Sequence, residues 1–507
     1  MTGVKPRVFL AALFAALTVA QAQSEPFRPQ FHFTPERNWM NDPNGMVFYE
    51  GEWHLFYQYN PYGDRWGHMS WGHAVSRDLM HWQPLSLALA EEDGIMIFSG
   101  SAVVDWRNTS GFGKDGEPPL VAIYTGHREG RQDQRIAFSN DRGRTWTKVP
   151  GAPVLDLGMA DFRDPKVFWH AASSRWVMTV ALPTEKLVRF YTSPDLTRWT
   201  YAGAFGPAGA TTGLWECPDL FPVTVEGGGT KWVLIVNVNP GGPAGGSGSQ
   251  YFVGEFDGTR FIADADSRDV RWADYGADFY AGVSWSDVPD SDGRRVWLGW
   301  MSNWLYAQDV PTSPWRSAMT VPRELSLRRT PDGLRLVQKP VEELASLRRP
   351  SPLRFTGGTF AAAAEWLAGQ SGLPPLLDVD LSFTGVAGNA PFSIRLQTGP
   401  NEGTSLTIDP ASQGLQLDRT NSGQTSFHRD FSARHAAPLR IADDAVRIRL
   451  LVDASSLEVF AQGGETVLTE LLFPSSRPRT LRLLSGGATP RVEAITIHAM
   501  TSARARR

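Results

Sequence analysis

The chain contains 507 residues and carries a formal net charge of −4, from 49 Lys and Arg against 53 Asp and Glu. This length exceeds the usual size of one domain, so two domains are expected. Because the charges are nearly balanced, without long basic or acidic runs, nucleic acids and anionic membranes are poor candidates for the main partner. The 19 Trp residues exceed what a core of this size requires, and their flat apolar faces suit stacking against sugar rings.

The first 22 residues have the pattern of an export signal. Lys5 and Arg7 give a positive start, an apolar run follows from Val8 to Ala20, and Ala20-Gln21-Ala22 fits a cleavage site. The run is too short to span a bilayer, and no later segment is long enough. We therefore expect a soluble exported protein, periplasmic or secreted, that begins near Gln23.

The next three hundred residues have the pattern of an all-β protein, because short Val, Ile, Phe, Tyr and Trp runs are separated by Gly, Asp and Pro. A turn motif recurs roughly every 55 to 65 residues: "SRDLMHW" (76–82), "SNDRGRTW" (139–146), "SPDLTRW" (193–199) and, more faintly, "GEFDGTRF" (254–261). This spacing suits a four-stranded unit, and radial repetition of such units makes a β-propeller.

The strand clusters predict five such units, beginning near Asn41, Phe98, Phe162, Trp215 and Asp278. The predicted fold class is therefore all-β, with a five-bladed β-propeller over residues 27–336. In a propeller the first strand of each blade lines the central axis. Residues at the starts of different blades are therefore expected to converge on one pocket.

The character of the sequence changes after Thr330. The segment "VEELASLRR" (341–349) is the best short helical pattern, so residues 337–351 are predicted to be a linker. From residue 352 to residue 500 apolar and polar residues alternate, as in "LQLDR" and "VRIRLLVD". This alternation predicts a C-terminal β-sandwich. Few carboxylates cluster there, so no chemistry is assigned to it.

Three acidic residues stand near the starts of predicted blades: Asp42 in "WMNDPNG", Asp164 in "FRDP" and Glu216 in "WECPD". Each motif alone fits an ordinary turn or a strand-end ion pair. Their equivalent blade positions make three unrelated structural roles a poor explanation. Cys217, directly after Glu216, is interpreted as a small buried side chain, because a reactive thiol requires surroundings that favour the thiolate.

Two carboxyl groups that face each other across a pocket suggest glycoside hydrolysis, in which one attacks the anomeric carbon and the other protonates the leaving oxygen. Burial and neighbouring negative charge keep such an acid protonated, and Glu216 is placed for this role. Asp42 stays ionised if N–H groups of its turn point at it. Asp164, beside Arg163, suits the binding of substrate hydroxyls.

The chain closely resembles glycoside hydrolase family 32, the β-fructofuranosidases that include levanases, exo-inulinases and invertases. The resemblance covers nearly the whole mature chain, and none of the three acidic positions departs from it. It is carried by "WMNDPNG" (39–45), "FYQYNP" (56–61), "WGHMSWGHA" (66–74), "FSGSAVVD" (98–105), "FRDPK" (162–166), "WECPDLF" (215–221), "DFYA" (278–281), "GWMSNWLYA" (299–307) and "VDASSLEVF" (452–460).

The resemblance implies a retaining double displacement in which Asp42 is the nucleophile, Glu216 the general acid and then base, and Asp164 the stabiliser of the transition state. It also implies a fructose pocket lined by Trp39, Met40, Asn41, Gln58, Trp66, Phe98, Ser99, Arg163 and Trp304. The expected partner is a fructan or sucrose, and neither a cofactor nor a metal is expected.

Exo-acting release of terminal β-D-fructofuranosyl units from levan, inulin and sucrose is the favoured function. A propeller forms a funnel, and "FSGSAVVD" and "MSNWLYA" are similar to exo-type members. An endo-fructanase would need an open cleft, and a fructosyltransferase would capture the same covalent intermediate with a sugar. A non-catalytic fructan-binding propeller would lack one of the three acids. The sequence does not rank the three substrates.

Overall fold

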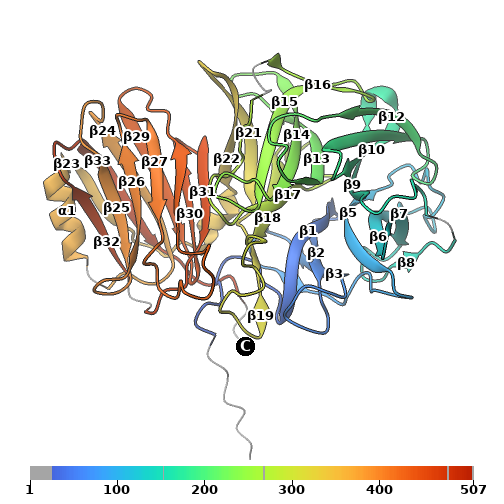
Figure 1. Ribbon diagram of the computed structural model, residues 1–507, viewed down its shortest axis with the longest axis horizontal. Coiled ribbons are helices and arrows are strands. Elements are labelled where there is room, and N and C mark those ends of the chain that lie inside the picture. The colour runs from blue at the N-terminus through green and yellow to red at the C-terminus, as the bar shows by residue number, and fades with distance from the viewer. Residues whose placement is uncertain (1–24, 152, 266–268, 371, 477–478, 505–507) are drawn as a thin grey trace, which may run out of the picture.

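The computed structural model describes residues 25–151, 153–265, 269–370, 372–476 and 479–504. The predicted export signal lies outside the described residues. Two strand-rich bodies stand side by side in Figure 1, a propeller built from β1 to β22 and a sandwich built from the strands that follow. The predicted fold class, an all-β propeller followed by a sandwich, is confirmed.

Five antiparallel sheets form the propeller, and each begins with an inner strand. The inner strands are β1 (Asn38–Tyr49), β5 (Met96–Val104), β9 (Arg163–His170), β13 (Leu214–Thr224) and β17 (Tyr280–Ser284). They begin within three residues of the five predicted blade starts. Neighbouring inner strands contact one another, and β17 contacts β1, which closes the ring.

The outer strands follow in chain order within each blade. Blade 1 continues with β2 (Glu52–Tyr59), β3 (Ser70–Ser76) and β4 (Gln83–Pro84), and blade 2 with β6 (Leu120–Arg128), β7 (Arg131–Ser139) and β8 (Thr147–Lys148). Blade 3 continues with the 3-10 turn η1 (Ala171–Ser173), then β10 (Arg175–Leu182), β11 (Leu187–Ser193) and β12 (Thr200–Phe205). Blade 4 adds β14 (Thr230–Asn239), β15 (Gly248–Phe256) and β16 (Phe261–Ala263), and blade 5 adds β18 (Arg295–Met301), β21 (Arg323–Thr330) and β22 (Gly333–Pro340).

Two short strands between β18 and β21 join the last blade to the first. β20 (Ala318–Met319) pairs with β18 of blade 5, whereas β19 (Trp315–Arg316) pairs in parallel with β1 of blade 1. The chain therefore ties the two ends of the propeller ring together with backbone hydrogen bonds.

The repeated turn motif joins the third and fourth strands of blades 1 to 4 and is held by its Asp. In the first three copies the Ser that ends the third strand donates its hydroxyl to this Asp: Ser76 to Asp78 at 3.0 Å, Ser139 to Asp141 at 2.8 Å and Ser193 to Asp195 at 3.3 Å. In the fourth copy Asp257 accepts the backbone N–H groups of Thr259 and Arg260, both at 2.8 Å. Short polar side chains that bind nearby backbone are what make such turns.

A β-bulge interrupts the inner strand of every blade. The pairing register shifts between Met40 and Pro43, Ile97 and Gly100, Arg163 and Lys166, Glu216 and Asp219, and Tyr280 and Val283. Asp164, Cys217 and Ala281, which lie in three of these bulges, have left-handed φ values of +67°, +44° and +51°. A bulge bends its strand and re-aims the side chains beside it, so each blade presents a few side chains toward the axis at one end.

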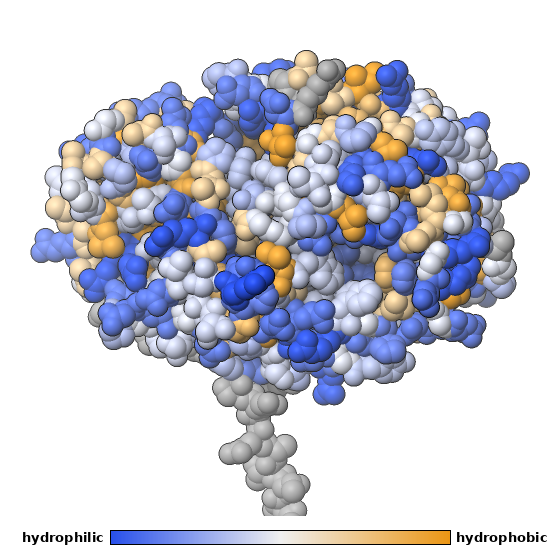
Figure 2. All heavy atoms as spheres, in the orientation of Figure 1, coloured by the Kyte–Doolittle hydropathy of each residue, from blue (hydrophilic) through white to orange (hydrophobic). Residues whose placement is uncertain are grey.

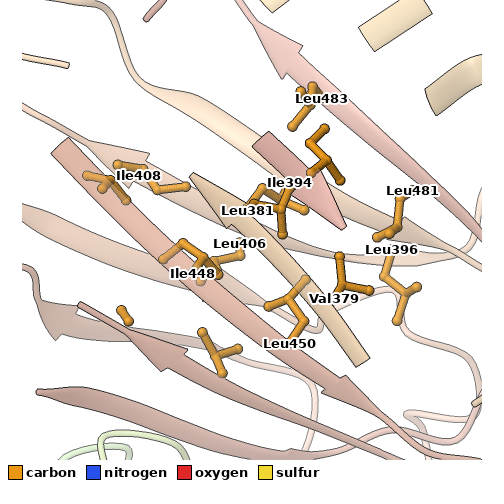
Figure 3. Packing of buried hydrophobic residues seen from close by; sticks show 14 of the residues in the cluster. Val379, Leu381, Ile394, Leu396, Leu406, Ile408, Ile448, Leu450, Leu481 and Leu483 are labelled. Carbon is orange, nitrogen blue, oxygen red and sulfur yellow. The ribbon is translucent and has the colours of Figure 1, made fainter. Parts of the chain in front are cut away.

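The sandwich consists of two antiparallel sheets. One contains, in spatial order, β23 (Leu353–Thr359), β33 (Arg491–Ala499), β24 (Leu377–Thr384), β29 (Ala445–Val452), β30 (Ser456–Ala461) and β31 (Thr466–Leu471). The other contains β28 (Arg434–Pro438), β27 (Gly414–Asp418), β26 (Gly403–Asp409), β25 (Phe392–Gln397) and β32 (Thr480–Ser485). Alternate residues of both sheets fill the core between them, including Val379 and Leu381 from one and Ile394 and Leu396 from the other (Figure 3).

Two segments differ from the expected pattern. β22 runs to Pro340, so the propeller sheet includes the first residues predicted as a linker, and the helical part of that linker is the 3-10 helix η3 (Glu342–Leu347). The α-helix α1 (Phe360–Gly369) interrupts the strands expected from residue 352. The Thr359 side chain caps it by accepting the N–H of Ala362 at 3.2 Å, and its Ala-rich sequence favours the helix.

A buried ionic network joins the N-terminal segment, blade 5 and the sandwich. His32 contacts Asp453 at 2.8 Å and Glu458 at 2.7 Å, and Arg323 contacts Glu458 at 2.5 Å. Burial alone would lower the pKa of His32, but the two carboxylates raise it to about 9. Both carboxylates belong to "VDASSLEVF", so this segment of the sandwich ties the two domains together.

The surface seen in Figure 2 is mostly hydrophilic, and its hydrophobic residues lie in small separate groups. Within the part of the chain that the structure describes, no helix is both long and apolar enough to cross a membrane.

Candidate active site

A cavity of about 380 Å³ lies at the end of the propeller axis where the inner strands carry their bulges. It is lined by Asn41, Asp42, Gln58, Trp66, Phe98, Ser99, His127, Gln132, Asp161, Arg163, Asp164, Leu214, Glu216, Asn239 and Trp304. Asp42 comes from blade 1, Asp164 from blade 3 and Glu216 from blade 4. Three acids that are far apart in the sequence therefore share one cavity.

Asp42 is held by side chains. Its Oδ2 accepts the Ser99 hydroxyl at 2.7 Å, and its Oδ1 accepts the Asn41 amide at 3.1 Å. Burial is the largest influence and raises the pKa of Asp42, whereas the Ser99 and Asn41 hydrogen bonds oppose that rise. A hydroxyl and an amide therefore hold Asp42, where N–H groups of its own turn were expected.

Asp164 is almost fully buried and has a left-handed φ of +67°. Its Oδ2 accepts the backbone N–H of Cys217 at 2.9 Å, and its own N–H donates to the Thr125 hydroxyl at 3.0 Å. Burial raises the pKa of Asp164 to about 7; Arg163 opposes the rise, and the charges of Glu216 and Asp42 add to it. The pKa of this carboxyl therefore lies near neutral pH.

Two side chains hold Glu216 by hydrogen bonds to its two carboxylate oxygens. Arg163 donates from Nε at 3.0 Å and Nη2 at 2.9 Å to Oε1, and the Tyr280 hydroxyl donates to Oε2 at 2.5 Å. Asp161 holds the other side of Arg163 through Nη1 at 2.7 Å. The side chain of Arg163 is thus directed to Glu216 and Asp161, although the sequence places it next to Asp164.

Cys217 lies beneath the three acids and is 5% exposed, as its predicted role as a small buried side chain requires. Its Sγ lies 3.4 Å from Asp42 Oδ2 and 3.6 Å from Asp164 Oδ2. Burial, followed by the neighbouring carboxylates, raises the pKa of this thiol well above its ordinary value. The thiol is therefore protonated and able to donate a weak hydrogen bond to either Asp.

Seven of the nine residues named for the fructose pocket line the cavity, and two do not. Trp39 and Met40 are completely buried beneath it. Trp39 donates its N–H to Asn41 Oδ1 at 2.7 Å and stacks on Trp304 at a centroid distance of 5.9 Å. These contacts position two lining residues, so Trp39 supports the cavity from behind, and Met40 belongs to the hydrophobic cluster that joins blade 1 to blade 5 and the sandwich.

Some cavity residues escaped the sequence analysis. His127 stacks on Phe98 at a centroid distance of 4.3 Å and an interplanar angle of 6°, and Gln132 lies 3.2 Å from the His127 ring. Both come from the β6–β7 hairpin, whose sequence carries no motif. Asp161 directly precedes "FRDP", and Tyr280 lies within "DFYA", so these two had a local signal that was not assigned a role.

Asn239 lines the cavity and begins the Gly-rich segment 239–249. Asn303 ties that segment down by donating to Gly245 O at 3.1 Å, and the Ser247 hydroxyl accepts the N–H of Trp304 at 3.1 Å. The segment therefore positions an aromatic wall of the cavity. Among the described residues, no group of three or more His, Cys, Asp and Glu side chains is arranged to hold a metal ion.

Comparison with known proteins places this geometry in context. Residues 32–340 match the family model described as "Glycosyl hydrolases family 32 N-terminal domain", and residues 350–499 match "Glycosyl hydrolases family 32 C terminal". A levanase of Bacillus subtilis is 50% identical over 94% of this chain and 70% of its own length. An extracellular exo-inulinase of Aspergillus niger is 43% identical over 97% of this chain and 99% of its own length.

Solved structures give the same picture. The crystal structure of exo-inulinase from Aspergillus awamori superimposes with a TM-score of 0.88 at 40% identity, covering 94% of this chain and 99% of that one. A β-fructofuranosidase from Schwanniomyces occidentalis complexed with fructosyl-erythritol has a TM-score of 0.85 at 33% identity, covering 94% and 98%.

Proposed function

The chain belongs to glycoside hydrolase family 32, and on that premise we propose that it is a retaining, exo-acting β-fructofuranosidase. It hydrolyses terminal β-D-fructofuranosyl residues of fructans such as levan and inulin, and of sucrose. Relatives named levanase and exo-inulinase support this substrate class. The observation that carries the proposal is that three acids from three blades share one cavity, each with different hydrogen-bond partners.

Asp42 is the nucleophile in this account. Its carboxylate attacks the anomeric carbon of the fructosyl unit, and the bond to the leaving oxygen breaks, which gives a covalent fructosyl-enzyme. Ser99 and Asn41 stabilise the ionised form that attacks and fix its direction. Cys217, whose Sγ lies 3.4 Å from Asp42 Oδ2, supplies no competing nucleophile while its thiol keeps its proton.

Glu216 is the general acid and then the general base. Its proton goes to the leaving oxygen in the first step, and in the second step the same carboxylate takes a proton from the water that attacks the fructosyl-enzyme. Arg163 and Tyr280 fix the position of the carboxyl during both transfers. Asp161 in turn positions Arg163.

Asp164 stabilises the transition state. Its remaining acceptor sites face the cavity and can bind fructose hydroxyls, and such contacts accelerate the reaction only if they strengthen in the transition state. Hydroxyl donors on a bound sugar favour the ionised form. Substrate binding is therefore expected to lower the pKa of Asp164 from about 7.

We also propose that the protein is secreted, with cleavage near Ala22, because its relatives include extracellular enzymes. Residues 27–336 form the catalytic domain and residues 352–500 the sandwich in this assignment. The segment between them is short and tied to both domains, since Arg348 in it contacts Asp378 of the sandwich at 2.7 Å and Glu343 contacts Arg294 of the propeller at 2.8 Å.

Product analysis tests the proposed function. Purified protein is incubated separately with levan, inulin and sucrose, and the products are followed by chromatography. Free fructose as the only early product from either polymer is the expected result. Early oligofructosides would contradict the exo mode, transfer products from sucrose would favour a fructosyltransferase, and no release from any substrate would favour a non-catalytic binding protein.

A further inference from the structure

A second cavity, of about 540 Å³, lies toward the other ends of the inner strands of blades 3, 4 and 5. β9 carries Asp164 near one end and Trp169 near the other, and β13 likewise carries Glu216 and Phe221. At roughly 3.3 Å per residue, five residues of strand place Trp169 and Phe221 about 17 Å from Asp164 and Glu216. The aromatic walls of the second cavity are therefore remote from the acids, whereas Lys166 and Asp219 of its floor stand two and three residues from them.

The two cavities do not merge. Between them lies a space of only about 10 Å³, which is lined by residues that include Asp164 and Lys166. That volume holds about one water molecule. A sugar cannot pass from one cavity to the other. A ligand therefore enters the second cavity, called the lower cavity below, from the opposite end of the propeller.

The floor of the lower cavity contains buried polar atoms without partners. Asp219 and Ser284 are completely buried, and Ser286 is 8% exposed. Among the described residues, Asp219 Oδ1, the hydroxyls of Ser284 and Ser286, and Arg295 Nε form no hydrogen bond. Buried groups of this kind are destabilising unless they bind something. Most of these atoms lie just under the surface of the floor, and the polar lining groups with exposed surface include Ser286, Asp287 and Arg295. A hydroxyl, a carboxylate and a guanidinium match a ligand that both donates and accepts.

The charges of the floor cancel. Lys166 lies 3.6 Å from Asp219, and Asp287 and Arg295 line the same cavity, which gives two cations and two anions. The walls are aromatic and partly exposed, with Trp169 and Trp232 as the largest faces. A neutral, polyhydroxylated ligand fits such a site, because its hydroxyls bind the floor and its C–H faces pack on the rings.

We propose that this lower cavity is a second, non-catalytic sugar-binding site that holds a fructosyl unit of a polymeric substrate. The choice of a fructosyl unit rests on the proposed function, whereas the fit to a neutral sugar rests on the lining alone. A polymer bound there stays near the catalytic cavity while fructose is hydrolysed from its free ends. Sucrose, which has one fructosyl unit, gains nothing from the second site.

Filling the cavity tests the proposal. Ala172 lies on its exposed rim in η1, so Ala172→Trp places an indole in the space without removing a wall. Ala411→Trp, in an exposed turn of the sandwich, is the matched control. Each substitution is made in an Asp42→Asn background, and migration is measured in native gels that contain levan, inulin or no polymer.

The expected result is that Ala172→Trp lowers retardation by at least one fructan several-fold and Ala411→Trp does not. Trp169→Ala, checked by thermal unfolding, gives the same loss by removing a wall. Retardation that is equal with and without Ala172→Trp, or absent throughout, overturns the proposal and leaves a cavity that holds only water.

Activity separates this inference from the function. For activity assays Ala172→Trp is made in protein that keeps Asp42. It is expected to change kcat/KM for sucrose by less than about twofold, because the catalytic cavity is untouched. Failure of the unmodified protein to hydrolyse any fructan or sucrose overturns the proposed function. Insensitivity of retardation to Ala172→Trp overturns only the second site.

Discussion

At the scale of single residues, the three acids differ in what surrounds them. Asp42 accepts a hydroxyl and an amide, Glu216 accepts a guanidinium and a phenol, and Asp164 accepts the backbone N–H and the weak thiol donor of Cys217 and faces two other carboxyls. Burial is the largest influence on Asp164 and raises its pKa to about 7. Such different surroundings are what different roles in one reaction require.

The raised pKa of Asp164 predicts a pH-dependent stability. The folded protein keeps a proton on Asp164 that the unfolded chain releases near pH 4, so this site lowers the free energy of unfolding progressively between about pH 4 and pH 7. Asp164→Asn removes that penalty. The melting temperature of the variant relative to the natural protein is therefore expected to rise from about pH 4.5 to about pH 8, measured by calorimetry; a difference that falls over this range would contradict the assignment.

At the scale of elements, a bulge in each of the five inner strands directs side chains into the candidate active site. With regular pairing, successive side chains would point to opposite faces of each blade. The bulge instead turns the residues at the active-site end of each inner strand in a new direction. Gly45 in β1 shows how tight this arrangement is. Its φ is +53°, and an added Cβ would lie 2.7 Å from Phe56 and 2.9 Å from Trp71.

Gly45→Ala is therefore expected to lower stability by about 1–3 kcal/mol through backbone strain and overpacking. It should also reduce kcat, because Asp42 stands three residues away in the same distorted strand. Gly51→Ala is the matched control, since Gly51 has a φ of +78° in the β1–β2 turn with nothing within 4 Å of an added Cβ. If chemical denaturation gave the same loss of unfolding free energy for both variants, the packing around Gly45 would contribute nothing to stability.

The sequence predicts those features whose signal is local. The Ser and Asp of the turn motif make the same hydrogen bonds in blades 1 to 3, and the strand clusters counted all five blades correctly. α1 was missed because an Ala-rich stretch has no apolar period to distinguish it from neighbouring strands. His127 and Gln132 were missed because only the packing of β6 and β7 brings them to Phe98. Arg163 was placed beside Asp164 because sequence adjacency does not reveal which way a bulge turns a side chain.

At the scale of the whole molecule, charged residues are buried at the interface between the propeller and the sandwich. The His32 network is one cluster, and Arg419 of the sandwich forms another with Asp278 at 2.6 Å and Glu470 at 2.8 Å. Replacing one member of a buried pair leaves a charge without a partner, which is strongly destabilising. The two domains are thus expected to unfold together.

His32 makes the domain junction sensitive to alkaline pH. Its pKa of about 9 in the folded protein lies above the ordinary value of 6.5, so its charged form stabilises the fold fully below about pH 6.5 and loses this effect as the pH rises through 9. The stability lost by His32→Gln is expected to be on the order of 3 kcal/mol greater at pH 6 than above pH 9.

Thermal unfolding at both pH values measures this change. His81→Gln is the control, because His81 forms an exposed pair with Asp78 that contributes little. A loss for His32→Gln that is the same at both pH values would mean that the histidine is not charged in the folded protein.

The most direct test of the account concerns the nucleophile. Glu216→Ala protein is mixed with a fructoside whose leaving group departs without protonation, and its peptides are analysed by mass spectrometry. The fructosyl-enzyme forms but decays slowly, because the base that activates water is missing. We predict one fructosyl group on the peptide that contains Asp42, and none when Asp42→Asn is added. An adduct on another residue, or turnover without any adduct and with inverted product configuration, would contradict the assignment of Asp42.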